Sequence, residues 1–379
     1  MKTLILLSCL VALGLASPFH QHGFLDFMDD ITGMQNEEGS ADDFTPVPKK
    51  PEPPVVVPTV TYGYPICPFA CQCHIRVVQC SDLGLKEVPA DIPTDTTLLD
   101  LQNNKITEIK EKDFKGLSKL YALYLVNNKI SKVHPKAFLP LATIQKLYLS
   151  KNALVEIPKN LPQSLVELRI HENRIKKVPK QAFQGMKHMN CIEMGGNPLE
   201  NGGFEPGAFD GLKLNYIRIS EAKLSGIPKD LPNTLHELHL DHNRIQTIEL
   251  EDLIRYSNCV QVRGPCHELG LGFNQIRDIE NGSLSFLQNL REIHLDHNNL
   301  TRVPAGLTDM KYLQVVYLHS NNISQVGDND FCPPGFGFKK AFYHGISLFN
   351  NPVNYWDVKP AAFRCVTDRM AIQFGNYRK

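Results

Sequence analysis

Few of the features that mark membrane proteins or enzymes occur in this sequence. After the apolar run Leu4–Leu15, no stretch of the 379 residues is long and apolar enough to cross a bilayer, which predicts no membrane span. The sequence also lacks a nucleophile elbow, a Walker loop and a zinc-protease helix motif, so we expect no enzyme and no cofactor. Basic and acidic side chains number 40 each, and we expect no nucleic-acid partner.

Basic residues are missing from one part of the chain. Residues 17–44 contain 7 Asp or Glu and no Lys or Arg, and the segment that follows, to residue 66, is rich in Pro. Such a composition cannot bury enough apolar surface to fold, so we expect an acidic and then Pro-rich disordered tail. The tail is interpreted either as an interaction segment or as a solvated linker. No serine in it is followed by glycine.

The N-terminus has the pattern of a secretory signal. Lys2 supplies the positive charge, Leu4–Leu15 the apolar run and Gly14-Leu15-Ala16 a small-residue cleavage site. We therefore interpret residues 1–16 as a signal peptide and the protein as secreted. Of the 10 cysteines, Cys9 lies in this peptide, and the rest suit an oxidising compartment. Their odd number implies at least one free or intermolecular thiol.

An eight-residue pattern, LxLxxNxL, recurs along most of the chain. Alternating Leu positions predict a short strand with one buried face, and the Asn side chain can bond the turn that follows. One repeat cannot bury its own apolar face, so neighbours must stack. We predict an α/β leucine-rich-repeat solenoid of about twelve repeats, with parallel strands on the concave face and a mostly irregular convex side. Copies begin at Val78, Leu99, Leu123, Leu147, Leu168, Ile192, Ile217, Leu238, Leu269, Ile293, Val316 and Ile346, of which Val78 and Ile217 open degenerate copies.

The cysteines and the repeat spacing divide the folded part of the chain. We predict a cysteine-rich N-terminal cap at residues 67–98, repeats at 99–315, and an elongated repeat with a C-terminal cap at 316–379, in which Trp356 packs. A long repeat step holds an inserted loop near 258–266, where Cys259 and Cys266 are close enough for a disulfide. Cys191 would then be the free thiol, on the concave side and of low reactivity because no cation lies nearby in sequence.

The residue between the two Leu-type positions of each repeat should face the concave side, the default binding surface of a curved solenoid. Polar, charged and aromatic residues alternate there, and Tyr and Arg are favoured interface anchors. We interpret this row as a protein-binding groove rather than as merely solvated positions, with self-association as an alternative use. The candidate residues are Tyr124, Tyr148, Arg169, Glu193, Arg218, His239, His294 and Tyr317.

Two copies of the sequence His-Leu-Asp-His-Asn begin at His239 and His294. Stacked copies could gather metal ligands, but these two do not lie in adjacent repeats, and His242 and His297 fall in turns. We therefore predict no metal site in this region.

Three sequons make their Asn residues candidate N-glycan acceptors in a secreted protein. Asn281 lies in a connecting segment and is the first choice, followed by Asn322 and Asn299, which each follow a repeat Asn.

The N-terminal cysteine spacing, Cys67-x3-Cys71-x-Cys73-x6-Cys80, the repeat steps and the long penultimate repeat resemble class I small leucine-rich proteoglycans, a class that includes decorin and asporin. Segments 76–85, 189–200 and 363–369 carry the resemblance, which covers nearly the whole chain. It implies the disulfides Cys67–Cys73, Cys71–Cys80 and Cys332–Cys365. It also implies a propeptide at 17–36, cut between Asn36 and Glu37, so that the tail occupies 37–66.

The resemblance further implies a protein of the extracellular matrix that binds fibrillar collagen and growth factors of the transforming growth factor beta group, and that helps regulate matrix assembly and signalling. A soluble ligand of innate immune receptors, such as Toll-like receptors, is the alternative, and dimerisation through the concave face is also implied. The chain departs from the family at its glycosaminoglycan site, because Ser40, the one candidate, precedes Ala41 rather than Gly. The insertion at 258–266 is likewise outside the pattern and is interpreted as a lineage-specific loop or an artefact of the gene model.

Overall fold

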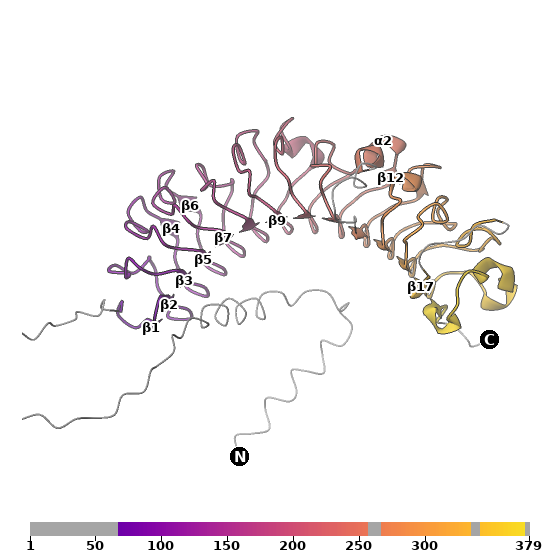
Figure 1. Cartoon of the computed structure of the whole chain (residues 1–379), viewed down its shortest axis with the longest axis horizontal. Helices are drawn as coiled ribbons and strands as arrows, with labels where there is room; N and C mark the ends of the chain where they lie inside the picture. Colours follow the sequence, from indigo (N-terminus) through magenta and orange to yellow (C-terminus); the bar gives the residue numbers. More distant parts are fainter. Residues whose placement is uncertain (1–66, 257–266, 335–341, 376–379) are drawn as a thin grey trace, which may run out of the picture. The chain divides into compact units, whose positions relative to one another are not determined.

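The computed structural model describes residues 67–256, 267–334 and 342–375. These belong to one unit, residues 63–379, and within it short strands form a 14-stranded sheet. Figure 1 shows the strands lining the inner side of a curved solenoid. In sheet order they are β1 (Gln72–His74), β2 (Val77–Gln79), β3 (Leu98–Asp100), β5 (Ala122–Tyr124), β7 (Lys146–Tyr148), β8 (Glu167–Arg169), β9 (Cys191–Glu193), β10 (Tyr216–Arg218), β11 (Glu237–His239), β13 (Glu268–Gly270), β15 (Glu292–His294), β16 (Val315–Tyr317), β17 (Gly345–Ser347) and β18 (Ile372–Gln373).

The strands pair in parallel and in register, except that β1 and β2 are antiparallel. The middle residue of each repeat strand from β2 to β17 points into the core and is buried, as Leu99, Ile192 and Ile293 illustrate. The phenylalanines of the connecting segments pack behind them, with the rings of Phe114 and Phe138 stacked at 5.9 Å. The predicted solenoid of about twelve repeats, with its parallel concave sheet, is therefore confirmed.

The outer side of the solenoid holds only short elements in the described residues. Two pairs of two-residue strands lie there, β4 (Glu108–Ile109) with β6 (Lys132–Val133) and β12 (Thr247–Ile248) with β14 (Asp278–Ile279). The helical pieces are short. They are α2 (Leu250–Leu253), which a 3-10 turn at 254–256 follows, η1 (Asn201–Gly203), η3 (Leu284–Phe286), η4 (Tyr355–Asp357), η5 (Pro360–Phe363) and η6 (Arg369–Ala371). The convex side is thus mostly irregular, as the short repeat length predicts.

The repeat asparagines tie each repeat to the one before it. Asn128 donates from Nδ2 to the carbonyl of Leu101 at 2.9 Å and to that of Leu125 at 3.3 Å, and its Oδ1 accepts the backbone N–H of Ile106 at 3.1 Å. Its side chain is buried, so these bonds satisfy groups that water cannot reach. The same set recurs at Asn197 and Asn298.

One repeat has Ala222 in place of this asparagine. An asparagine at this position would accept the backbone N–H of Leu199. In its absence, this N–H donates to the carbonyl of Asn197 at 2.7 Å. A different side chain links the two repeats near the outer edge. Asn201 accepts the N–H of Ser225 at 2.8 Å and donates to the carbonyl of Gly226 at 2.9 Å. The inter-repeat side-chain connection is therefore moved rather than lost.

Disulfides close both ends of the array. Cys67–Cys73 and Cys71–Cys80 hold the β1–β2 hairpin, and Cys332–Cys365 joins the elongated repeat to the C-terminal cap, which are the pairs implied by the family resemblance. Arg364 adds hydrogen bonds to Asn329 Oδ1 and to the carbonyl of Cys332. The expectation that Trp356 packs inside this cap is wrong. Trp356 is 67% exposed, because it lies on the outer single-turn helix η4, where its ring meets the adjacent Tyr355 ring edge to face.

Candidate functional site

The concave face carries columns of side chains, because parallel strands in register place equivalent residues side by side. One column follows the buried middle residue of each strand and is the row predicted from the sequence. A second column precedes the middle residue and was not considered in that prediction. Its charged members include Glu167, Glu237, Glu268 and Glu292.

The first half of the face is built around two tyrosines and an arginine. The rings of Tyr124 and Tyr148 meet edge to face at 4.8 Å, and the Arg169 guanidinium lies 4.7 Å from the centre of the Tyr148 ring. Arg169 Nε also donates to Glu167 Oε1 at 2.6 Å. The tyrosines are only 8% and 6% exposed, because the narrow strand spacing packs their rings against each other. They stiffen the face more than they offer free anchors.

Glu193 extends this half of the face. His171 Nδ1 lies 3.3 Å from its Oε2. Burial alone would raise the pKa of Glu193, but the His171 hydrogen bond and the charge of Arg169 outweigh burial and lower the pKa to about 2. Arg218, on the next strand, is more open, with a side chain that is 39% exposed and lies 3.7 Å from Glu221. We call Tyr124, Tyr148, Arg169, Glu193 and Arg218 the arginine segment.

The second half of the face has imidazoles where the first has guanidinium groups. His294 Nε2 lies 3.0 Å from Glu292 Oε1 and 3.3 Å from Glu268 Oε1. His239 lies two strands away, with Nε2 3.6 Å from Glu237 Oε2 and Nδ1 3.7 Å from Glu268 Oε1. Burial alone would lower the pKa of His294, yet the two neighbouring carboxylates raise it to about 10. We call Glu237, His239, Glu268, Glu292 and His294 the histidine segment.

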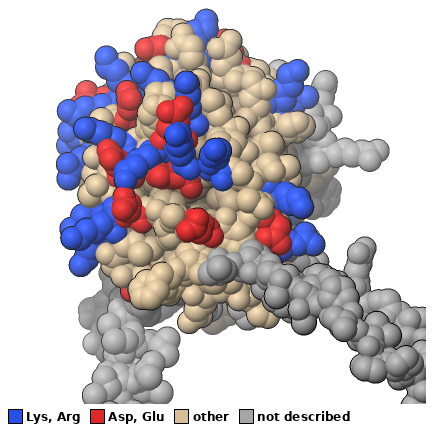
Figure 2. All heavy atoms as spheres, turned by 90° about the vertical axis from the view of Figure 1, so that its left-hand side faces the viewer, with Lys and Arg blue, Asp and Glu red and all other residues tan. Residues whose placement is uncertain are grey.

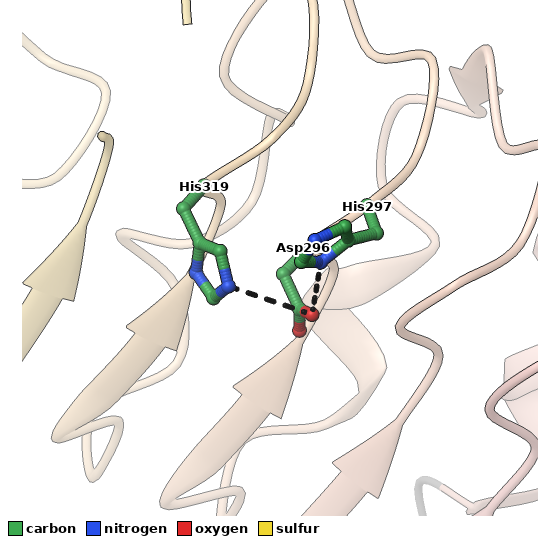
Figure 3. A group of neighbouring side chains, drawn as sticks. All are labelled: Asp296, His297 and His319. Atoms are coloured by element: carbon green, nitrogen blue, oxygen red, sulfur yellow. Dashed lines mark hydrogen bonds and ion pairs between the residues drawn. The ribbon is translucent and has the colours of Figure 1, made fainter. Parts of the chain in front are cut away.

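A further group of imidazole and carboxylate side chains lies beside the histidine segment, toward the turns that follow the strands. Figure 3 shows Asp296 between two imidazoles, with its Oδ2 3.0 Å from His297 Nδ1 and 3.7 Å from His319 Nε2. Next to it, Phe273 stacks between His242 at 4.1 Å and His297 at 3.9 Å. The two His-Leu-Asp-His-Asn copies are therefore joined by residues of the repeat between them. From the sequence, two copies in non-adjacent repeats were not expected to form one group of side chains. In the structure they do, because Glu268 and Phe273 of the intervening repeat contact histidines of both copies.

The other predicted positions are accounted for as follows. Tyr317 stacks on the His294 ring at 4.4 Å, so it belongs to the edge of the histidine segment. Cys191 is a free thiol on β9, and burial raises its pKa, which fits the predicted low reactivity. Asn281, Asn299 and Asn322 are all exposed, so each is open to a glycan, although glycosylation itself stays a prediction.

Several predicted features lie outside the described residues. They are the signal peptide at 1–16, the propeptide at 17–36, the cleavage pair Asn36 and Glu37, the tail with Ser40, and the cysteines Cys259 and Cys266.

The outer surface near the N-terminal end is of mixed charge. Figure 2 shows Lys and Arg side chains interspersed with Asp and Glu on this side. Ion pairs account for part of the pattern, such as Lys110 with Glu87 and Lys136 with Glu111. These pairs are exposed and contribute little to stability. Within the described residues, no helix is long and apolar enough to cross a membrane.

Comparison with known proteins agrees with this geometry. The leucine rich repeat family matches residues 95–154, 163–224 and 267–323, and the leucine rich repeat N-terminal domain matches residues 66–93. Together with the capped solenoid, these matches define a leucine-rich-repeat protein.

The relatives narrow the class further. The chain is 68% identical to biglycan of Rattus norvegicus over 381 residues, which cover 100% of both chains. It is 69% identical to biglycan of Homo sapiens over 372 residues, 98% of each, and 68% identical to that of Xenopus laevis over 381 residues, 100% of each. The chain belongs to the biglycan family of small leucine-rich proteoglycans. It is a secreted protein of the extracellular matrix and not an enzyme.

Proposed function

We propose that this chain binds fibrillar collagen and growth factors of the transforming growth factor beta group through the arginine segment, and so regulates matrix assembly and signalling. The observation that carries the proposal is the alternation of charge along one straight column, Arg169, Glu193 and Arg218, on three neighbouring strands. Residues in such a column are spaced by about 4.8 Å, the distance between paired strands.

Fibrillar collagen suits such a column. Only Gly fits at the axis of its triple helix, so the side chains at the other two positions of each triplet point outward, ionisable ones included. A rigid column of alternating sign can pair with these charges in one register and reject others. The packed tyrosines favour this use, since a stiff surface loses little entropy on binding.

Charge reversal on the column tests the proposal. Arg218→Glu is the principal variant, because its exposed side chain can be replaced with little effect on the fold. We expect collagen-fibril co-sedimentation and growth-factor binding to weaken about 10-fold or more, which corresponds to about 1.4 kcal/mol. Arg302→Glu is the matched control, since Arg302 is 82% exposed and pairs with Asp278 of the outer strand β14.

Arg169→Glu extends the test, provided that its unfolding temperature is measured alongside. Unchanged collagen and growth-factor binding by both variants would contradict the proposal. Binding to Toll-like receptor ectodomains, measured with the same proteins, tests the alternative. A variant that loses receptor binding but keeps collagen binding would assign the column to immune signalling instead.

A further inference from the structure

His239 has an unusual environment for a polar side chain. The residue is only 7% exposed, and its Nε2 atom is buried without a hydrogen-bond partner. Nearly all buried polar groups in folded proteins have such a partner, and leaving one unpaired is costly. The position therefore calls for an explanation beyond packing.

Two carboxylates face this imidazole at a characteristic separation. Glu237 Oε2 is 3.6 Å from His239 Nε2, and Glu268 Oε1 is 3.7 Å from His239 Nδ1. These distances are too long for hydrogen bonds. Zinc binds nitrogen and oxygen ligands at about 2.0–2.2 Å, so two ligand atoms in a tetrahedral site lie about 3.4 Å apart. The Glu237 oxygen is at about this distance from Nε2, whereas the Glu268 carboxylate lies on the Nδ1 side of the ring. The ligand atoms of all three residues lie within 4.8 Å of one another, so a rotation of the Glu268 side chain would bring its carboxylate to an ion held by Nε2.

Negative charge is concentrated around the same point. Five carboxylates lie no more than 3.9 Å from an imidazole nitrogen of this part of the face. They belong to Glu237, Asp241, Glu268, Glu292 and Asp296. The imidazole nitrogens in these five pairs belong to only two residues, His239 and His294, so the carboxylates outnumber them. A divalent cation would compensate this charge at any pH where the ligands are deprotonated.

Glycines leave room for the carboxylates. Gly270 stands between His239 and His294 in the column, and a Cβ atom there would lie 2.4 Å from Asp241 Oδ2. A Cβ on Gly272 would lie 2.9 Å from Asp296 Oδ1. The Asp241 carboxylate occupies this space and accepts the N–H of Gly272 at 2.9 Å. Larger residues at either glycine would push the acidic side chains away from the imidazoles.

We propose that the concave face binds one divalent transition-metal ion of the zinc class, with His239 Nε2 and the carboxylates of Glu237 and Glu268 as ligands. His294, 3.3 Å from Glu268 Oε1, orients the shared carboxylate. Nitrogen and carboxylate ligands together select zinc over calcium, which prefers oxygen ligands alone. The group of Asp296, His297 and His319 is a weaker candidate, because His297 Nδ1 already has a hydrogen-bond distance of 3.0 Å to Asp296.

The experiment uses the full secreted chain, stripped with a chelator and loaded with Zn²⁺ or with Co²⁺ as a spectroscopic probe. Bound metal is counted by mass spectrometry, and thermal unfolding is followed with and without Zn²⁺. We expect Glu268→Gln and His239→Gln to hold one ion fewer than the wild type, or to bind it at least 10-fold more weakly. We also expect them to lose the increase in unfolding temperature that Zn²⁺ gives the wild type. Calcium should give no such increase.

His236→Gln is the matched control, because His236 lies three residues before His239 and pairs its ring with His267, outside the proposed site. It should bind as many ions as the wild type. Any metal held elsewhere in the chain is common to all variants and cancels in the comparison. Glu268→Gln keeps the shape of the side chain and removes a negative charge, so it should fold in the absence of metal. Equal metal content and equal zinc response in the wild type, Glu268→Gln and His239→Gln would overturn the proposal.

Discussion

The two halves of the concave face solve the same electrostatic problem in different ways. In the arginine segment, the carboxylates Glu167 and Glu193 lie beside Arg169, whose charge is permanent. In the histidine segment, Glu237, Glu268 and Glu292 lie beside imidazoles. The comparison teaches that one scaffold can present a fixed charge pattern in one half and a conditional one in the other, where the balance depends on protons or on a bound cation.

Removing the permanent cation should have the largest effect. Arg169→Met leaves Glu167 and Glu193, both half-buried, without the guanidinium group that they share. Breaking a buried pair on one side costs about 3–5 kcal/mol of unfolding free energy. Glu268→Gln, the corresponding change in the histidine segment, should cost about 1 kcal/mol or less without metal, since it removes one carboxylate partner of His294 but leaves Glu292 in place and lowers the repulsion among the carboxylates.

Urea unfolding of both variants, in the presence of a chelator, measures the difference. Equal destabilisation by the two substitutions would show that the halves of the face do not differ in the way the contacts suggest.

Acid should weaken the arginine segment through Glu193. The pKa of this carboxyl is lowered to about 2 in the folded chain from an ordinary value of 4.5. A depressed pKa contributes stability that is fully present above pH 4.5 and is lost as pH falls toward 2. The full loss should amount to about 3.5 kcal/mol, given about 1.4 kcal/mol for each pKa unit, and about 2 kcal/mol of it should already be lost at pH 3. Denaturant unfolding at pH 6, 4 and 3 measures it, with Glu193→Gln as the variant that should lose less over the same range.

A smaller effect on stability is expected from adding a side chain at Gly270, in the histidine segment. Gly270→Ala places a methyl group against Asp241 and should cost about 1–2 kcal/mol through the shift that it forces. Gly345→Ala, on the same face, is the control, since its new Cβ would lie an ordinary 3.6 Å from Val315. Thermal unfolding compares the two. An equal response would mean that the space over Gly270 is not needed by the carboxylate.

The sequence predicted the solenoid because its signal is repeated in every turn, and one Leu or Asn out of place changes little. It also placed the concave row of Arg169, His239 and His294 correctly on one face. It missed the glutamates that precede the buried strand residue, such as Glu268, because only one of the two exposed columns was considered. The alternation of a strand was the available signal, since residues on both sides of a buried Leu share the opposite face.

Contacts between repeats could not be predicted in the same way. Whether His239 meets His294 depends on what the intervening repeat supplies, and there a small residue, Gly270, and an acidic one, Glu268, happen to coincide. The burial of Tyr124 and Tyr148 likewise follows from ring packing across strands rather than from any pattern within one repeat.

Ala222 has a consequence for how the repeat solenoid unfolds. In a repeat protein, each unit is stabilised mainly by its neighbours, so cooperativity depends on the weakest junction. At this junction the buried inter-repeat bonds of the repeat asparagine are absent, and Asn201 supplies bonds nearer solvent. Water can compete for such bonds more readily than for those at Asn197. Under tension or partial denaturation, the solenoid should open first between the β9 and β10 repeats, leaving two stacks that each keep an unbroken ladder of asparagines.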